Sequence, residues 1–490
     1  MPSRRRFLRT SAAATAALLS SAALEGTLAR IARGVSQRAE GYGPLLKDPR
    51  GLLDLPAGFD YVVLSTSARS DGRDAAFQQQ LPNGDPVPCR HDGMGSFTGP
   101  NGVTILVRNH EVDPEHGLGV DPGRARPWDP LGKGGTTTLW VDRDRKLVRS
   151  FASLSGTFRN CAGGVTPWGS WLTCEECTYT PGELSAASYD QRPDVAKRHG
   201  YVFEVPALAE EIVEPVPILA MGRFYHEAVA VDAATGHVYL SEDRDDGMLY
   251  RYRPAVLEGG KRKPADLKPG DLGKGGVLEA LRIAGRPQEK TQNWLGGETP
   301  FVPGRAFKVE WVKIPNLDPD VDMARDPAHA EPDPLKKRAR TAPGSIRAQG
   351  WDLGAAQFAR VEGMTGAGRH IYFCATNGGG LLAGQVWKID CVKQELSLVV
   401  EPNDRTVLEG PDNLVVAPNG DLIVCEDGKA DDYVVGITRE GRCYPIARNA
   451  HNDEEFAGAC FSADGRTLFV NIQEPGITLA IRGPWSRRHV

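Results

Sequence analysis

The sequence has 490 residues, of which 40% are hydrophobic and 25% are charged, and its formal net charge is −5. This composition excludes a generally disordered chain and allows a large buried core. The acidic balance also argues against nucleic acid as a structural partner, because such a partner would require a basic stripe on the protein.

The first thirty residues have the order of an export signal. A basic segment that contains Arg4 and Arg5 precedes a weakly apolar run of small residues, which is too short to span a membrane. The paired arginines and the "FL" that follows them are typical of a twin-arginine signal. We therefore expect residues 1–30 to lie outside the fold, the twin-arginine export machinery to be a partner, and the protein to be periplasmic or extracellular.

In the first half of the chain, the segments "FDYVVLS", "VTILVRN", "TTTLWVD" and "WGSWLTCEE" have the apolar, β-branched and aromatic character of strands. From Ala228 onward one unit recurs, in which an apolar run, a glycine turn and a second apolar run are followed by acidic or amide residues. Four segments follow it: "AVAVDAATGHVYLSED", "VEGMTGAGRHIYFCATN", "NLVVAPNGDLIVCEDG" and "GACFSADGRTLFVNIQEPG". Each segment predicts a β-hairpin.

The last three of these hairpins begin about fifty and about forty-five residues apart, which is typical of a four-stranded propeller blade. Further strand-like segments, such as "GQVWKID" and "YVVGITR", lie between them and can complete each blade. We therefore predict an all-β fold, a six-bladed β-propeller formed by one domain over residues 45–488. Two charged, proline-containing segments, Glu258–Gly276 and Asn316–Ser345, are predicted to be inserted surface loops.

Acidic and amide residues gather at the ends of these predicted strands. The groups that follow strands are Asn109-His110-Glu111, Cys174-Glu175-Glu176, Glu242-Asp243-Arg244 and Glu426-Asp427, and those that precede or open strands are His226-Glu227, Arg360 with Glu362, and Pro411-Asp412-Asn413. A propeller brings such positions to one end of its central channel. Because carboxylates in one pocket repel each other unless cations neutralise them, the pattern predicts a shared metal site. Oxygen ligands suit calcium, whereas a thiolate beside glutamates suits iron or zinc.

Nine cysteines are an odd number for an exported chain, so at least one thiol is unpaired or binds metal. Cys174 and Cys177 flank Glu175 and Glu176, but no other cysteine pair has the close spacing of a structural zinc site. The segment also lacks the helix of a thioredoxin-like motif. A Cys174–Cys177 disulfide and a role of Cys174 as a metal ligand both remain open.

Several motifs resemble the PhoX family of secreted alkaline phosphatases: "NCAGGVTPWGSWLTCEE", "GRFYHEAVAVD", "YLSEDR", "RVEGM", "PDNLVVAPNGDLIVCEDG" and "NIQEPG". The resemblance extends from about Asp54 to Trp485. It implies a six-bladed propeller whose channel holds two oxo-bridged Fe³⁺ ions and several Ca²⁺ ions. It also implies hydrolysis of small-molecule phosphate monoesters and, in some members, diesters.

The resemblance further implies roles for individual residues. Cys174, Glu227 and Glu362 match iron ligands, and Arg360 matches the cation that holds the substrate phosphate. On this basis we expect Arg360, Glu362 and Cys174 to be catalytic. The wider calcium and iron site would comprise Glu175, Glu242, Asp412, Asn413, Glu426 and Asp427, with His226, Arg244 and Asn109 around it.

Two other classes of protein compete with this interpretation. A calcium-dependent propeller lactonase also gathers Glu, Asn and Asp in its channel, but it needs no thiolate. A propeller that only binds a protein or carbohydrate would tolerate the loss of every acid named above. We expect a monomeric phosphatase and expect substitution of Cys174 by serine to distinguish the three classes.

Overall fold

The computed structural model describes residues 37–67, 81, 84–113, 116–182, 194–260, 262–294, 301–320 and 344–486. The export signal predicted at residues 1–30 lies outside these residues, and so does most of the loop predicted at residues 316–345. In the described part of the chain, no helix has both the length and the apolar character needed to cross a membrane.

Strands form most of the regular structure. In the first half of the chain they are β1 (Leu45–Leu46), β2 (Leu53–Pro56), β3 (Asp60–Thr66), β4 (His91–Thr98), β5 (Thr104–His110), β6 (Gly134–Val141), β7 (Leu147–Thr157), β8 (Asn160–Val165), β9 (Ser170–Glu175), β10 (Val202–Pro206), β11 (His226–Val231), β12 (Val238–Glu242) and β13 (Leu249–Pro254). In the second half they are β14 (Gly276–Ile283), β15 (Ala306–Lys313), β16 (Val361–Ala367), β17 (His370–Ala375), β18 (Gln385–Asp390), β19 (Glu395–Val400), β20 (Pro411–Val416), β21 (Leu422–Glu426), β22 (Tyr433–Ile437), β23 (Cys443–Asn449), β24 (Phe456–Phe461), β25 (Thr467–Ile472) and β26 (Ile477–Arg482).

Helical structure is short in the part of the chain that the structure describes. It comprises α3 (Ile346–Asp352) and the 3-10 turns η2 (Pro100–Gly102), η3 (Leu219–Met221), η4 (Ala255–Gly260), η5 (Pro264–Asp266) and η6 (Leu272–Lys274). Ser345 caps α3 by accepting a hydrogen bond from the Ala348 amide at 3.1 Å. The turns η4 to η6 lie in or overlap the predicted insertion at residues 258–276, and the described residues of this insertion form no strand before Gly276.

The four hairpins predicted from the repeated unit are all present, as the pairs β11–β12, β16–β17, β20–β21 and β24–β25. Their turns contain glycine with positive φ, for example Gly420 at 90° and Gly465 at 67°. A residue with a Cβ would be strained there. The alternation of apolar residues and the turn glycines were therefore sufficient to locate these strands.

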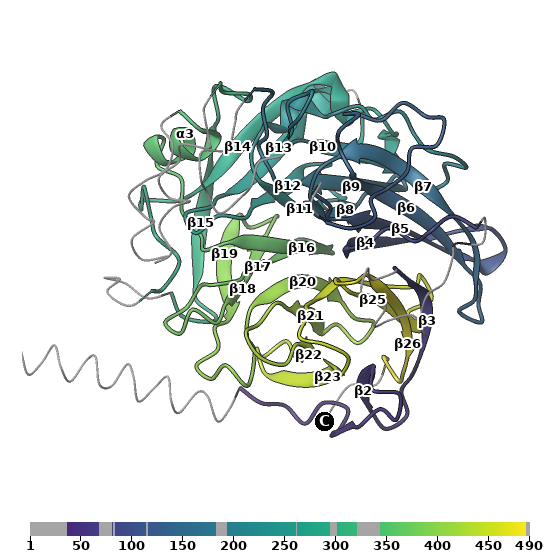
Figure 1. The fold of residues 1–490 in the computed structure, drawn as a ribbon. Helices are drawn as coiled ribbons and strands as arrows, with labels where there is room; N and C mark the ends of the chain where they lie inside the picture. The colour runs from purple at the N-terminus through teal and green to yellow at the C-terminus, as the bar shows by residue number, and fades with distance from the viewer. Residues whose placement is uncertain are drawn as a thin grey trace, which may run out of the picture.

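The strands form five antiparallel sheets arranged in a ring (Figure 1). The innermost strands β4, β8, β11, β16, β20 and β24 contact one another in that order, and β24 returns to contact β4. The fold is thus all-β and propeller-like, as predicted. The sheets do not divide into six separate units, because β15 pairs with both β14 and β19 and so joins two sheets into one of nine strands.

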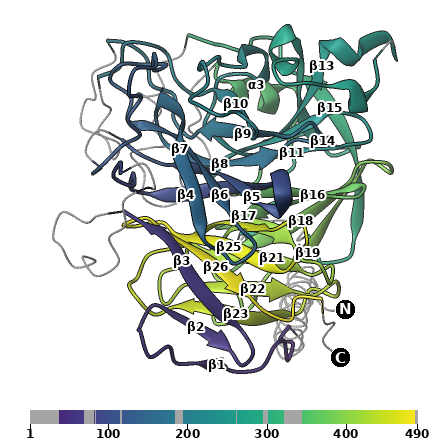
Figure 2. The same cartoon turned by 90° about the vertical axis from the view of Figure 1, so that its right-hand side faces the viewer.

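Both ends of the described chain close the ring. The N-terminal strand β3 pairs with the C-terminal strand β26, with Tyr61 opposite Ile481, and Figure 2 shows these two strands side by side. Strand β2 pairs with β23, with Leu53 opposite Asn449. Because these pairs join residues that are far apart in sequence, the ring is complete only when the chain ends are in place.

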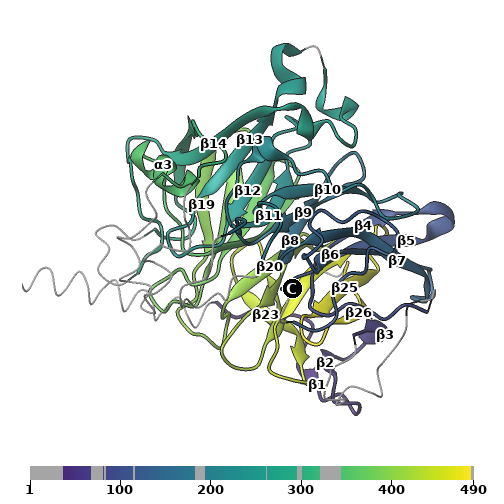
Figure 3. The same cartoon turned by 45° about the horizontal axis from the view of Figure 1, so that its top comes forward.

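The core lies between neighbouring sheets. Leu106 and Val107 are consecutive in β5, but Leu106 packs with Phe469 on one side of the sheet, and Val107 packs with Trp171 and Phe203 on the other. This alternation is what the pleat of a strand requires. On the opposite side of the ring, α3 lies at the outer edge near β14 (Figure 3). Apolar burial on both faces of the sheets therefore fixes the position of each inner strand.

Candidate active site at the centre of the ring

The six innermost strands share one irregularity near their first residues. In each of them the register with the next strand shifts over a few residues, as it does between His226 and Val229 of β11 and between Val361 and Met364 of β16. A β-bulge of this kind redirects side chains. In each case the backbone amide of the residue just after the neighbouring strand donates to the backbone carbonyl oxygen of the residue just before the bulge. The six bonds are Glu111→Arg90, Glu176→Arg159, Asp243→Tyr225, Thr376→Arg360, Asp427→Gly410 and Gln473→Glu455.

Glycines allow the inner strands to approach each other closely at these bulges. A Cβ on Gly93 of β4 would lie 2.5 Å from the Cα of Ala162 in β8. A Cβ on Gly363 of β16 would lie 2.5 Å from the carbonyl oxygen of Asp412 in β20. Any larger residue would force neighbouring strands apart, so these glycines bring the residues beside them together.

Three carboxylates meet at this point. Glu227 of β11, Glu362 of β16 and Asp412 of β20 are buried, and each offers an oxygen that lies within 4.8 Å of the other two. Burial, and then the charge of neighbouring carboxylates, raises the pKa of Glu227 and Glu362 well above the ordinary value. The same causes raise the pKa of Asp412 to about 7. The donor set therefore fits a bound cation, which would stabilise the charged form of all three.

Further charged groups surround these three carboxylates. Burial and the charges of Glu111 and Asp412 raise the pKa of Asp92 well above its ordinary value. Gln473 donates from Nε2 to Asp92 at 3.2 Å and to Glu111 at 3.1 Å. The carboxylates of this group are Asp92, Glu111, Glu176, Glu227, Asp243, Glu362, Asp412, Asp427 and Glu455, and its arginines are Arg90, Arg159, Arg244 and Arg360. We call this set the central cluster.

A thiol that the sequence analysis did not select borders the central cluster. Cys161 is the second residue of β8, the position that Glu227 occupies in β11 and Asp412 in β20. Its thiol lies 3.4 Å from the carbonyl oxygen of His226 and 3.7 Å from that of Glu227. Burial, followed by the charge of Glu227, raises the pKa of Cys161 well above its ordinary value. The equivalence of strand positions was the signal that could have identified Cys161.

The structure places Cys174 elsewhere. Its side chain is fully buried in an apolar cluster with Leu172, Val202 and Val229. Cys174 and Leu172 lie two positions apart in β9 and therefore share one face of the strand. We correct the predicted position of Cys174 accordingly: of the two thiols, Cys161 lies beside Glu227.

Glu175, predicted to belong to the metal site, faces away from the central cluster. Its carboxylate accepts hydrogen bonds from the amides of Phe158 at 3.1 Å, Gly200 at 2.9 Å and Tyr201 at 3.2 Å. It also forms a buried ion pair with His199 at 2.6 Å. Glu175 therefore has a complete set of partners in the segments just before β8 and β10, and this structure gives it no part in the cluster.

Glu242 and Glu426, like Glu175, have hydrogen-bond partners outside the central cluster. Glu242 accepts hydrogen bonds from the Tyr250 hydroxyl at 2.8 Å and from Arg347 at 2.7 Å. Glu426 accepts from the amides of Glu409 at 2.7 Å and Tyr433 at 3.1 Å. Each of these glutamates ends the second strand of its hairpin, and successive strand residues point to opposite sides. The next residue in each case, Asp243 or Asp427, belongs to the central cluster.

Arg360, the predicted phosphate-binding residue, lies within the central cluster. Its Nε and Nη2 atoms each donate to one carboxylate oxygen of Asp243 at 2.9 Å, and Nη2 also pairs with Glu362. Its φ of 53° is in the left-handed region, and Arg90 and Arg159 occupy the equivalent places with φ of 48° and 46°. The same backbone turn thus supplies an arginine from three of the inner strands.

The remaining predicted residues support the backbone around the cluster. Asn413 accepts from the Gly458 amide at 2.9 Å and donates to Asp412 at 3.0 Å. Asn109 donates to the carbonyl oxygens of Cys161 at 3.0 Å and Ala162 at 2.7 Å. His226 contacts the Gly222 carbonyl oxygen through Nε2 at 3.0 Å. These contacts hold β8, β11 and β20 in place.

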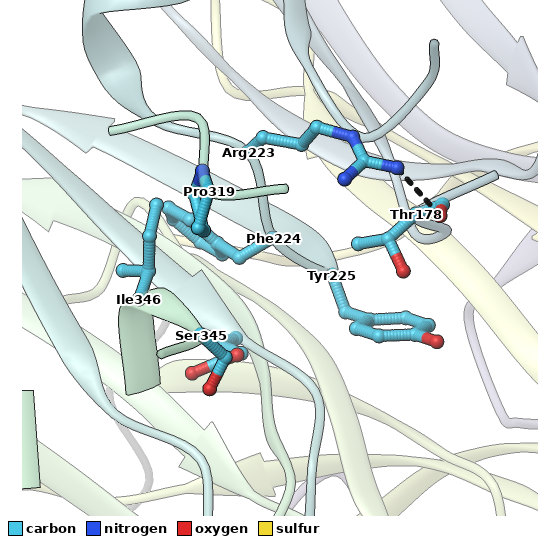
Figure 4. A pocket seen from close by; sticks show the side chains of 8 residues that line it. Thr178, Arg223, Phe224, Tyr225, Pro319, Ser345 and Ile346 are labelled. Atoms are coloured by element: carbon cyan, nitrogen blue, oxygen red, sulfur yellow. Dashed lines mark hydrogen bonds between the residues drawn. The ribbon is translucent and has the colours of Figure 1, made fainter. Parts of the chain in front are cut away.

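A small pocket lies beside the ring of Tyr225 (Figure 4). Its volume is about 10 Å³, and Thr178, Arg223 and Glu242 are among its lining residues. Such a space holds at most one water molecule. A larger groove of about 960 Å³ is lined by residues that include Arg38, Glu426 and Tyr444. Neither the pocket nor the groove is lined by Glu227, Glu362 or Asp412, so both lie outside the group of three carboxylates.

The family model described as alkaline phosphatase PhoX matches residues 40–476 of the chain. Among solved structures, Pseudomonas fluorescens PhoX in complex with vanadate, a transition state analogue, matches with a TM-score of 0.62 and 18% identity, over 90% of this chain and 97% of that one. A gluconolactonase from Xanthomonas campestris matches with a TM-score of 0.36 and 11% identity, over 87% of this chain and 96% of that one. None of the curated proteins compared with the chain matches it.

Proposed function

The chain belongs to the PhoX family of alkaline phosphatases, and from that premise we propose that it hydrolyses phosphate esters at the central cluster. It is a phosphoric ester hydrolase by family. The observation that supports this location is the convergence of Glu227, Glu362 and Asp412 from three different inner strands onto one buried point beside Arg360. We propose monoesters as the principal substrates, with diesters as a second class.

We also propose that the fold has six blades. Six inner strands form the closed ring, and each carries the same bulge and the same amide-to-carbonyl bond from its neighbouring strand. The nine-stranded sheet then consists of two blades, β11 to β14 and β16 to β19, joined by β15.

For the cofactor we propose iron together with calcium. The carboxylates of the central cluster suit a hard cation, and the Cys161 thiol beside Glu227 would suit a transition metal. Glu227, Glu362, Asp412 and Cys161 are the residues that we expect to hold metal. When bound, such cations would neutralise the cluster and polarise the phosphoryl group of the substrate.

The residues of the chain would then position the substrate. Asp243 holds the guanidinium of Arg360 through two parallel hydrogen bonds, which leaves the Nη1 of Arg360 outside this pair. A forked, permanently charged group of this kind suits a phosphoryl oxygen. Arg360 would therefore orient the ester and share the negative charge that develops on the phosphoryl oxygens.

We propose further that the protein is exported by the twin-arginine route and acts as a monomer in the periplasm or outside the cell. The basis is the sequence of residues 1–30, in which the paired arginines precede a short apolar run. That route carries folded proteins, so it would allow the cluster to receive its metal before export.

The test is elemental analysis of protein purified from its native export route, with hydrolysis of p-nitrophenyl phosphate measured on the same sample. We expect both iron and calcium in each chain, and activity that is lost on chelation. Hydrolysis without iron would contradict the proposed cofactor. Calcium without any hydrolysis of phosphate esters would contradict the proposed function.

A further inference from the structure

Arg244 differs from the other arginines of the central cluster. Arg90 pairs with Glu111 at 2.5 Å, Arg159 pairs with Glu176 at 2.9 Å, and Arg360 pairs with Asp243 at 2.9 Å. Within the described residues, the Nε and Nη2 atoms of Arg244 are buried and have no hydrogen-bond acceptor. Arg244 is therefore the arginine of this cluster whose donors are not already engaged by a carboxylate of the chain.

The guanidinium of Arg244 is nevertheless held in a defined place. Its Cζ atom lies 3.2 Å from the centre of the Tyr225 ring, in a cation–π contact. The carbonyl oxygen of Arg244 accepts from the amides of Arg360 at 2.8 Å and Gly247 at 2.7 Å. These bonds fix the backbones of Arg244 and Arg360 to each other, and the charges of Glu176 and Asp243 act on the Arg244 guanidinium.

Buried N–H donors without an acceptor are costly, and the cost is higher when the donor group is charged. An anion that binds at Arg244 would remove this cost by supplying the missing acceptors. The guanidinium offers Nε and Nη2 as two parallel donors, which is the geometry that matches two oxygens of a phosphoryl group. Arg244 as a residue is half-buried, so part of it is in contact with solvent.

We propose that Arg244 is a second phosphate-binding residue, which acts with Arg360 and favours monoesters over diesters. This proposal rests on the proposed function. A phosphate monoester has three non-bridging oxygens and two negative charges, whereas a diester has two such oxygens and one charge. Arg360 and the cations would bind some of the non-bridging oxygens. The two donors of Arg244 would then contribute more binding energy with a monoester, which has one more charged oxygen, than with a diester.

The test compares Arg244→Ala and Arg244→Lys with the wild-type holoenzyme. We expect Arg244→Ala to lower kcat/KM for p-nitrophenyl phosphate about 100-fold, and that for bis(p-nitrophenyl) phosphate less than about 10-fold. Arg244→Lys should keep the charge but lose the fork and give an intermediate loss for the monoester. Equal losses for the two substrates would overturn the monoester preference.

Binding of inorganic phosphate, measured by calorimetry on metal-loaded protein, gives a reading that does not depend on turnover. We expect Arg244→Ala to weaken phosphate binding at least about 10-fold, with metal content and melting temperature near those of the wild type. The matched control is Arg282→Ala, which removes an exposed arginine that pairs with Glu310 away from the cluster and should leave phosphate binding unchanged. Unchanged phosphate binding in Arg244→Ala would overturn the proposal. A wild-type protein that binds phosphate but hydrolyses neither ester would instead overturn the proposed function.

Discussion

At the scale of single residues, the two cysteines of the "NCAGGVTPWGSWLTCEE" motif, Cys161 and Cys174, provide a direct test. Cys161 lies beside Glu227, whereas Cys174 lies in an apolar cluster with Leu172. We expect Cys161→Ser to lose iron and most of the phosphatase activity, because the thiol would be a metal ligand. Cys174→Ser should keep iron and activity, although it places a hydroxyl among apolar side chains and should lower the melting temperature.

Elemental analysis and hydrolysis of p-nitrophenyl phosphate on both purified variants decide this prediction, with Cys374→Ser as a further buried-thiol control. Loss of iron in Cys174→Ser but not in Cys161→Ser would contradict the position that the structure assigns to these thiols. The sequence motif alone favoured Cys174, because the adjacent acids drew attention to it. The direction of each side chain depends on the strand register, which composition does not reveal.

The paired acids that end the second strands give a second residue-scale prediction. Glu175 accepts three backbone amides and pairs with His199, whereas Glu176 pairs with Arg159 in the central cluster. We expect Glu175→Gln to cost about 3 kcal/mol of folding free energy, because it leaves a buried cation with one carboxylate fewer. Glu176→Gln should cost less stability, because it also removes one of the carboxylates that repel each other in the central cluster, where burial and neighbouring charges raise the pKa of Glu176 to about 7. It should reduce activity.

Thermal unfolding and steady-state kinetics on both variants separate the two roles. A Glu175→Gln protein with wild-type stability but reduced metal content would contradict this assignment. The sequence correctly predicted that acids gather at the ends of these strands. It could not tell which member of each pair faces the channel, because neighbouring residues in a strand differ only in which side of the sheet they face.

At the scale of structural elements, a buried charge network joins β9 to the segment before β10. His199 lies between Glu175 at 2.6 Å and Asp129 at 3.2 Å, with the rings of Phe158 and Tyr179 nearby. Burial lowers the pKa of His199, but the two carboxylates outweigh it and raise the pKa from 6.5 to about 9. The imidazolium is therefore the form that the folded protein holds at neutral pH.

This raised pKa predicts how stability depends on pH. A pKa that is higher in the folded state than in the unfolded state adds stability that is fully present below pH 6.5 and is lost as the pH rises through about 9. The shift corresponds to about 3 kcal/mol. We expect denaturant titrations to show this loss in the wild type, and His199→Gln to be less stable at pH 6 with a flatter profile up to pH 10. A wild-type profile that does not fall between pH 7 and pH 10 would contradict the prediction.

Sequence patterns predicted the hairpins, but they did not predict how the sheets join. The alternation and turn glycines of "NLVVAPNGDLIVCEDG" located β20 and β21, with the turn near Gly420. The same reasoning did not predict that β15 would bridge β14 and β19, because that pairing depends on which strand edges meet in space. Nor could it predict the bulges, since a bulge leaves no periodic signal.

At the scale of the whole molecule, the closure of the ring depends on a small aromatic group near the C-terminus. Trp485 is 1% exposed and packs edge-on against Phe59 at 4.9 Å and Phe461 at 5.2 Å between ring centres. We expect Trp485→Ala to destabilise the protein by about 3–5 kcal/mol, because it leaves a cavity where the two chain ends meet. Urea unfolding should report this loss, and a cost below about 1 kcal/mol, which is typical of surface substitutions, would contradict it.

The cations proposed at the centre of the ring give a prediction about global stability. Glu227, Glu362 and Asp412 come from three different inner strands, so repulsion among them acts against the packing of these strands. Cations that bind these carboxylates only in the folded state must stabilise the whole ring, as any ligand of the native state does.

We expect chelation to lower the melting temperature by about 10 °C or more, and added metal to restore it. In Glu227→Gln, which removes one of the repelling charges and one ligand, chelation should have a smaller effect. Equal melting temperatures with and without metal in the wild type would mean that the cluster does not bind cations preferentially in the folded state, and the proposed catalytic site would then lack its basis.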